Sequence, residues 1–376
     1  MAKLRFDDYM KAVFAPIVGT TKLNRSLAVL KTAPLPPEEL VTQIRRLHSL
    51  EILDGGAVQL HNGDFIVRFT CEGETYLAVS VDNISNDDKG HIISIFENDD
   101  LALCEFEACY FLFLCHQLKD IYKIKPYLSA EAIVEMLNLS DVEFAQGYAG
   151  HDIDDVKMVY NELLFFKIPN DSLYLEKSDW YITARLALSN KNFRSVLVTD
   201  NVLTCAESLS GLSNINPENI YLSLTSVHWK HCFLEIYRCI EAIYYLPWMV
   251  ELKQNSKSPC NAVELAKICH NVGWREREVD SITKLFSILP FSVIHDMELN
   301  GLSALSGIVI ADDEESMRAL GRRLYKIRNE CVHQEDYEDL VKTNTSISCW
   351  QNLTELLYKV VYYFYTKYSS EITYTY

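Results

Sequence analysis

One segment near the end of this chain carries side chains that could act together on phosphate. Between residues 315 and 333 the sequence places cations, an amide and an imidazole at Arg318, Arg322, Lys326, Asn329 and His333. At about 100° per residue, these five side chains share one side of a helix, opposite an apolar stripe. The planar guanidinium of arginine can donate two parallel hydrogen bonds to phosphate oxygens. An imidazole with an ordinary pKa of about 6.5 exchanges protons at neutral pH. The pattern therefore suits holding a phosphodiester and moving a proton on it.

Arg328 lies apart from that group, at the apolar edge of the same helix, where a bundle or a dimer partner would cover it. A second interpretation fits the same spacing. The helix can carry a solvated basic face, with the Arg328 stem packed on the bundle and His333 as a cation that favours the helix C-terminus. The spacing by itself leaves both interpretations open.

The segment Arg328-Asn-Glu-Cys-Val-His333 resembles the Arg-x4-His motif of HEPN domains, in the form with Asn after Arg that is common among HEPN ribonucleases. An earlier segment, residues 232–245, is similar to the first helix of the Apea-like HEPN branch. Its aromatic-Arg-x-x-Glu core corresponds to Tyr237, Arg238 and Glu241. The resemblance covers roughly residues 220–370 and nothing before them.

The resemblance implies a metal-independent endoribonuclease of toxin or antiviral-defence (abortive infection) type. HEPN ribonucleases pair two bundles so that both motifs line one cleft, so we expect a homodimer formed through the C-terminal bundle and RNA as the substrate. His333 would then be the general acid or base, Arg328 would stabilise the phosphorane, and Asn329 would orient the imidazole or the phosphate. The other residues with expected roles are Arg318, Arg322 and Lys326 for RNA binding, and Arg238, Glu241 and Glu235 as supporting side chains. No metal and no cofactor is expected.

Two alternatives remain open at this point. The bundle could be a non-catalytic HEPN protein that holds RNA or a nucleotide, or the chain could be an adaptor that docks a cationic partner. The formal net charge of −17 excludes a protein that coats nucleic acid nonspecifically, so any RNA contact must be local. Residues 51–100 hold eleven acidic and two basic residues. This acidic region predicts solvated turns, or a face for a trigger or a regulatory protein.

The elements that position these residues fall into two parts. We expect an α+β N-terminal module over residues 1–216, followed by an all-α HEPN-type helical bundle over residues 217–376. The boundary is placed at Asn214-Ile-Asn-Pro217, because Asn-Pro breaks helices.

Within the first module, period-two patterns and turn residues predict an antiparallel meander over about residues 54–97. Its expected strands are 57–61, 64–70 and 75–81, with a fourth at 92–96. Residues 1–50 are expected to be mostly amphipathic helix, with a Pro break at residues 34–37, and further helices are expected at 105–118, 130–137 and 154–166.

The second module reads as helical throughout. Expected helices are 224–253 with a kink at Pro247, 262–271, 278–289, 313–333 and 347–367. The aromatic run at residues 356–365 is expected as core or dimer seam, not as a stacking platform for bases.

The remaining signals concern metals, phosphate loops and the compartment. The acidic cluster in residues 150–157 precedes a helix, so we interpret it as an N-cap and not as a metal site. No glycine-rich phosphate loop occurs, and the eleven cysteines show no zinc spacing. The first residues lack the apolar segment of a signal peptide, and no stretch of about 18 apolar residues predicts a membrane span. We expect reduced core cysteines and a cytoplasmic protein.

Overall fold

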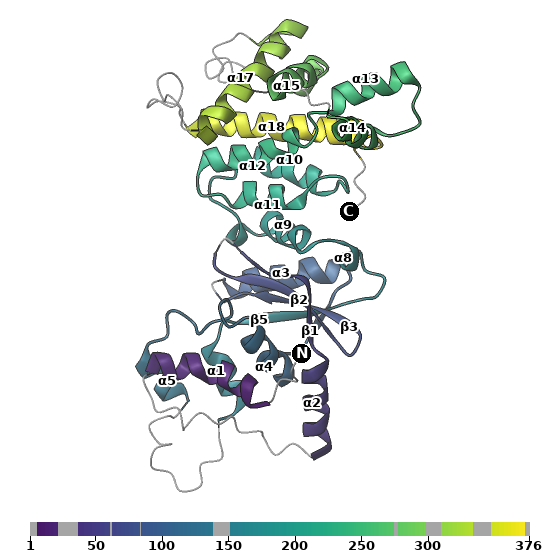
Figure 1. Ribbon diagram of the computed structural model, residues 1–376. Coiled ribbons are helices and arrows are strands. Elements are labelled where there is room, and N and C mark those ends of the chain that lie inside the picture. The colour runs from purple at the N-terminus through teal and green to yellow at the C-terminus, as the bar shows by residue number, and fades with distance from the viewer. Residues whose placement is uncertain are drawn as a thin grey trace. The chain divides into compact units, whose positions relative to one another are not determined.

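The computed structural model describes residues 6–21, 37–60, 62–82, 84–137, 151–273, 277–295, 297, 310–333 and 347–372. The chain separates into two compact units, Met1–Thr183 and Ala184–Tyr376. The first unit is α+β with an antiparallel sheet, and the described residues of the second unit are mostly helical (Figure 1). This coarse fold class is the one that the sequence predicts.

The expected boundary segment, residues 214–217, lies inside the second unit. There, the Asn216 side chain accepts from the backbone N–H of Glu218 at 3.0 Å, and Pro217 is the first residue of α11 (Pro217–Thr225). Proline is favoured at this position because the first helical N–H has no partner within the helix. The Asn-Pro pair therefore starts a helix within the unit.

The sheet of the first unit has five antiparallel strands in the order β1-β2-β3-β5-β4. The strands are β1 (Glu51–Gln59), β2 (Phe65–Cys71), β3 (Glu74–Ser80), β4 (Ala102–Cys104) and β5 (Leu163–Ile168). Gly63 and Gly73 have φ of 87° and 85° in the two turns of the meander. These turns need a residue that adopts positive φ, which explains the Asn-Gly and Glu-Gly pairs. The first three expected strands are confirmed.

Two expected elements of the first unit are wrong. Residues 92–96 are not a strand but belong to helix α3 (Asn86–Asn98), which Ser85 caps by accepting from the backbone N–H of Asp88. The expected helix at 154–166 ends early, as α7 (Ile153–Val159), and the chain then enters β5 between β3 and β4. A short apolar run such as Leu163–Ile168 has no clear period, so its sequence alone does not separate a buried strand from a helix.

Helices cover both faces of this sheet. Helices α1 (Phe6–Thr21), α2 (Pro37–Ser49) and α4 (Ala108–Gln117) lie on one face, and α3 and α8 (Leu173–Glu176) lie on the other (Figure 1). On the first face, Phe69 and Phe165 pack against Tyr110 of α4. On the second face, Phe166 packs against Phe96 of α3. Helix α5 (Ala130–Met136) completes the unit beside α1.

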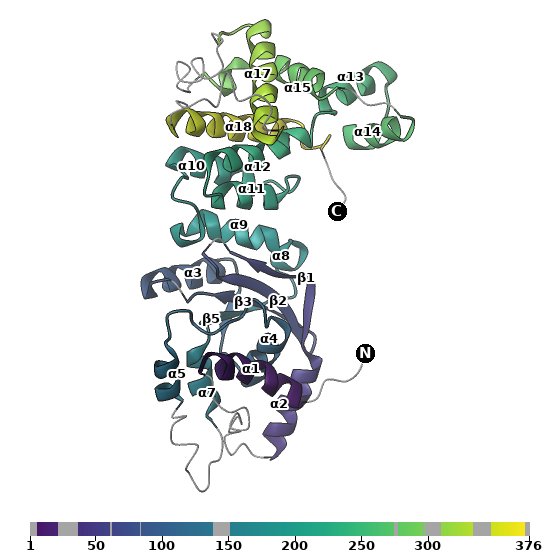
Figure 2. The same cartoon turned by 60° about the vertical axis from the view of Figure 1, so that its left-hand side comes forward.

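The second unit is built around α18 (Ile347–Lys367), which packs against α10 (Asp200–Ser210) and α12 (Trp229–Glu241) (Figure 2). Its buried side contains the expected core residues Leu356, Leu357, Val360, Val361 and Phe364, each 0% exposed. The other helices of the second unit are α13 (Leu246–Ser256), α14 (Ala262–Asn271), α15 (Glu278–Ser287) and α17 (Glu314–His333). Two short 3-10 turns are η2 (Lys191–Phe193) and η3 (Phe291–Val293). Helix α9 (Asp179–Ser189) contains the boundary between the two units.

The expected single helix at 224–253 is instead three helices, α11, α12 and α13. The first break precedes His228, whose Nδ1 accepts from the backbone N–H of Lys230 and so caps α12. The second break follows Glu241, and Pro247 then lies in the first turn of α13, where proline is tolerated. Pro247 marks a new helix start and not a kink.

Three further observations concern cysteines, membranes and metals. None of the eleven cysteines forms a disulfide, and each is buried or half-buried. Within the described ranges, no helix is long and apolar enough to cross a membrane. The same ranges hold no cluster of three or more His, Cys, Asp or Glu side chains that could bind a metal ion. The acidic cluster at 150–157 caps α7, because Asp152 accepts from the backbone N–H of Asp154 at 3.0 Å.

Candidate functional site on helices α12 and α17

The two segments that carry the resemblance meet at one ion pair. Arg328 of α17 donates from Nε to Oε1 of Glu241 on α12 at 2.7 Å, and its Nη2 lies 2.7 Å from the same oxygen. The two residues are 87 positions apart in the chain, so this contact depends on the packing of the unit. The side chains of Arg328 and Glu241 are 20% and 28% exposed. The pair therefore lies at the edge of the core and remains open to solvent on one side.

Local packing explains why Arg328 lies at this edge. The apolar side of α17, with Met317, Leu320, Leu324 and Ile327, is buried. Its close neighbour is α15, which approaches the backbone of α17 at Gly321. Since Ile327 points into the core, the next residue in the helix lies about 100° away, at the border between buried and exposed sides.

A third nitrogen fixes the orientation of the guanidinium. Nη1 of Arg328 donates to Oδ1 of Asn329 at 2.9 Å. Partial burial alone would lower the pKa of Arg328, but the charge and hydrogen bond of Glu241 raise it above its ordinary value. Arg328 is therefore a permanent cation held by contacts at all three of its nitrogens.

Two tyrosines lie next to this pair. The hydroxyls of Tyr237 and Tyr244 are 2.7 Å apart and hydrogen-bonded. Burial raises the pKa of both phenols, and the nearby Glu241 raises each further. Both rings therefore stay protonated at neutral pH and serve as hydrogen-bonding groups, not as bases. Tyr244 has no assigned role from sequence, and it lies in the turn between α12 and α13.

The three cations expected to bind RNA each have a carboxylate partner. Arg318 pairs with Glu314 at 2.7 Å and Arg322 with Glu315 at 2.5 Å. Lys326 lies 3.8 Å from Glu330. All three pairs lie on α17 itself and are partly or largely exposed, so each stabilises the fold by only about 0–1 kcal/mol. The strip on α17 is therefore a set of exchangeable ion pairs and carries little net charge.

The supporting residues on α12 form a pair of their own. Arg238, 57% exposed, donates to Glu235 at 2.8 Å. Burial raises the pKa of Glu235, and Arg238 opposes this rise. Of the three supporting residues that the sequence predicts, Glu241 alone shares a described hydrogen bond with Arg328.

The C-terminal end of α17 completes the candidate motif. His333 is the last residue of the helix, and its side chain lies outside the described part of the chain. Cys331, two residues earlier, is half-buried, and burial raises the pKa of its thiol to about 11. The thiol is therefore protonated at neutral pH and is a weak nucleophile.

Comparisons with protein-family models, curated proteins and solved structures give no match for this chain. The functional argument therefore depends on the side chains and their geometry. Arg328 and Asn329 present a fixed cation and an amide next to each other, and the end of α17 adds an imidazole in sequence. Such a set can bind a phosphodiester, and with the imidazole in place it can transfer a proton.

Proposed function

We propose that this protein is a metal-independent endoribonuclease of toxin or antiviral-defence (abortive infection) type, acting in the cytoplasm through Arg328, Asn329 and His333. The observation that supports the proposal is the Arg328–Glu241 ion pair, which joins the two helices that resemble HEPN helices and holds the guanidinium in one orientation. Preorganised donors of this kind stabilise charge that develops in a transition state without reorganising at the moment of reaction.

In this mechanism His333 removes the proton from the 2′-hydroxyl or donates one to the leaving 5′-oxygen, which contributes roughly 10²–10⁴ in rate. Arg328 stabilises the negative charge of the phosphorane. The amide of Asn329 has a defined orientation, since an arginine only donates and Oδ1 must therefore be the acceptor of the Arg328 bond. The Asn329 Nδ2 group then has its two hydrogens for a phosphate oxygen or for the imidazole.

Each chain supplies one Arg-x4-His motif and therefore one such imidazole. Transesterification needs proton transfer on both sides of the phosphorus, so the proposal includes a C2 homodimer in which two copies of the bundle share one cleft. RNA phosphates replace the carboxylate partners of Arg318, Arg322 and Lys326 on binding. Because these pairs are exposed and contribute little to stability, such an exchange costs little.

A second candidate function has support from the same contacts. If the Arg328–Glu241 pair only ties α12 to α17, the bundle is a non-catalytic protein that binds RNA or a nucleotide, or an adaptor. The observation that favours this candidate is that the four named cations of α17 each have a carboxylate partner. The two candidates differ in what happens to RNA, and in the effect of changing His333.

The test is cleavage of a labelled RNA by the purified full chain, with and without EDTA. We expect EDTA to have no effect, and His333→Ala and Arg328→Lys each to abolish cleavage while leaving the circular dichroism spectrum intact. Arg328→Lys keeps the charge and removes the planar fork. Lys267→Ala, a change of an exposed lysine on α14, is the matched control and should cleave as the wild type does.

Cleavage that survives His333→Ala, or that stops with EDTA, would show that the proposed site is wrong. RNA binding without cleavage under any condition would favour the second candidate. Sedimentation of the active protein as a single chain at micromolar concentration would contradict the shared cleft.

A further inference from the structure

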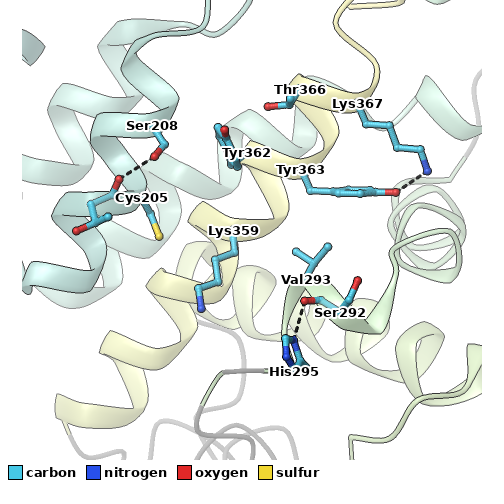
Figure 3. Close-up of a pocket in the computed structure, with 11 residues that line it drawn as sticks. Cys205, Ser208, Ser292, Val293, His295, Lys359, Tyr362, Tyr363, Thr366 and Lys367 are labelled. Atoms are coloured by element: carbon cyan, nitrogen blue, oxygen red, sulfur yellow. Dashed lines mark hydrogen bonds between the residues drawn. The ribbon is translucent and has the colours of Figure 1, made fainter.

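The second unit contains a pocket apart from the candidate site, lined by α10, by the turn around η3 and by α18 (Figure 3). Its volume of about 500 Å³ falls in the range of about 300–1,000 Å³ that is typical of small-molecule sites. None of its lining residues belongs to the candidate site on α12 and α17, so the inference below does not depend on the proposed function. The pocket is large enough for one small ligand.

The charge of this pocket is unlike that of the rest of the chain. The described residues that line it include Lys359, Lys367 and His295, and they include no Asp or Glu. The chain as a whole has a formal net charge of −17. Lys359 has a partner outside the lining, because its Nζ lies 3.2 Å from Glu355. The lining favours an anionic ligand.

Lys367 differs from the cations of α17. Its Nζ donates to the hydroxyl of Tyr363 at 2.5 Å and lies 5.0 Å and 5.3 Å from the ring centroids of Tyr363 and Tyr368. The hydrogen bond to Tyr363 raises the pKa of Lys367. In the part of the chain that the structure describes, the polar and electrostatic interactions of Nζ are with these two tyrosines, and no ion pair involves Lys367. Its charge is therefore met by rings and not by an anion.

The pocket also offers ring surface and hydrogen-bond acceptors. Tyr362 is 41% exposed and lies between the two lysines along α18 (Figure 3). The hydroxyls of Thr204 and Ser208 donate to the helix carbonyls of Asp200 and Thr204, at 2.9 Å and 3.1 Å. Because their hydrogens are used in this way, these oxygens act as acceptors towards a ligand. A ligand with its own donors, such as ribose hydroxyls or base amino groups, meets this requirement.

His295 adds one group of defined tautomer. Its Nδ1 lies 2.8 Å from the carbonyl oxygen of Ser292, and since a carbonyl only accepts, Nδ1 must carry the proton. In this tautomer Nε2 is an acceptor towards a ligand. Lys359 and Lys367 are eight positions apart, which corresponds to about 12 Å along α18 and is comparable to the length of a mononucleotide.

We propose that this pocket binds a nucleoside phosphate, whose phosphate is held by the cationic lining and whose base stacks on Tyr362. The lining cations and the missing carboxylates select the phosphate, and the exposed ring and the hydroxyl acceptors select the nucleoside. The ligand can be a free nucleotide or the phosphorylated end of an RNA, since both present the same groups.

The test is isothermal titration of the full chain with AMP at neutral pH and low salt, with adenosine and inorganic phosphate as separate probes. We expect AMP to bind more tightly than either part. Lys367→Ala should weaken AMP binding by about tenfold, as expected for a charge-assisted contact. Tyr362→Ala should weaken it by about tenfold through lost stacking. Lys267→Ala is the control lysine and should bind as the wild type does.

Adenosine and inorganic phosphate, as separate probes, distinguish the contribution of Tyr362 from that of Lys367. Adenosine binding should respond to Tyr362→Ala and not to Lys367→Ala, and phosphate binding should respond in the opposite way. Displacement of AMP by a short RNA with a 5′-phosphate would identify an RNA end as the source, and failure to displace it would identify a free nucleotide. The proposal is overturned if AMP does not bind at millimolar concentration, if both variants bind it as the wild type does, or if phosphate binds as tightly as AMP.

Discussion

The Arg328–Glu241 ion pair should show an energetic coupling that a double-mutant cycle can measure. The cycle compares Arg328→Ala, Glu241→Ala and the double variant with the wild type. Exposed ion pairs contribute about 0–1 kcal/mol, and breaking a fully buried pair costs about 3–5 kcal/mol. The side chains here are 20% and 28% exposed, between these limits. Both arginine contacts end on one carboxylate oxygen, so the fork does not engage both oxygens. We therefore expect a coupling of about 1–2 kcal/mol.

The assay is urea unfolding followed by tryptophan fluorescence. Four of the five tryptophans, Trp229, Trp248, Trp274 and Trp350, belong to the second unit, so fluorescence mainly reports its unfolding. A matched control is the pair of Arg238 and Glu235, whose side chains are 57% and 16% exposed. These residues are three positions apart on α12, and for such a pair within one helix we expect a coupling of about 0.3–0.5 kcal/mol.

The reasoning fails if the Arg328–Glu241 coupling is no larger than that of the control pair. A coupling of no more than about 0.3–0.5 kcal/mol would mean that the two groups interact no more strongly than a solvated ion pair within one helix. It would also remove the argument that Arg328 is preorganised, and with it the main support for a catalytic role. A coupling in the expected range, together with loss of RNA cleavage in Arg328→Lys, would show that the fork has a function beyond joining the helices.

Two further predictions concern stability. Gly321→Ala should lower the free energy of unfolding by about 1–3 kcal/mol in a thermal melt, because the new Cβ would lie 3.0 Å from the Ile282 carbonyl oxygen and 3.0 Å from Cβ of Phe286; an unchanged or higher melting temperature would contradict the close approach of α15 and α17. Burial lowers the pKa of His151, opposed by Asp155, so the unfolded chain takes up the proton first as pH falls below about 6.5. The wild type should therefore lose free energy of unfolding between about pH 7 and pH 5, by about 1.4 kcal/mol for each pH unit that separates the folded and unfolded pKa values of His151, and His151→Leu should lose less. Urea unfolding followed by circular dichroism measures this loss, because His151 lies in the first unit and tryptophan fluorescence mainly reports the second; an equal loss in the two proteins would refute the prediction.

Elements with a clear period and clear end signals are predictable from this sequence. The expected bounds of α14 and α18 agree with the structure at both ends, and α17 differs by one residue. Helix α14 shows why, because Asn261 and Glu264 form a capping box at its start and its apolar residues recur with helical spacing. Local sequence contains all of this information.

Elements that depend on distant partners are less predictable. Strand β5 is an apolar run that becomes a strand because β3 and β4 pair with it on both sides. Helix α3, in contrast, has a local signal, because Ser85 and two aspartates in its first turn already indicate a helix start. Its apolar residues at 92–96 outweighed that signal in the expectation of a strand.

The candidate site shows the same division. Sequence spacing identifies Arg328 and Asn329, and the resemblance adds Glu241, but the contact between Arg328 and Glu241 depends on how α12 packs against α17. The electrostatic effect of Glu278 on Arg328 comes from α15 and has no sequence signal. In contrast, Arg318–Glu314 and Lys326–Glu330 are i,i+4 pairs, and their spacing alone is enough to expect them.

The sequence does not predict the pocket at α18. Its lining comes from three separate segments of the chain. The sequence predicts core for residues 356–365, and most of these residues are buried in the structure. Lys359, Tyr363 and Lys367 recur every four residues on α18, which is the spacing of one exposed stripe. Of the two lysines, Lys359 has an ion-pair partner in Glu355, four residues before it, whereas Lys367 has tyrosine rings as its neighbours. Added salt should therefore weaken nucleotide binding at the α18 pocket chiefly by screening Lys367, whereas RNA binding at α17 must also break ion pairs within the protein.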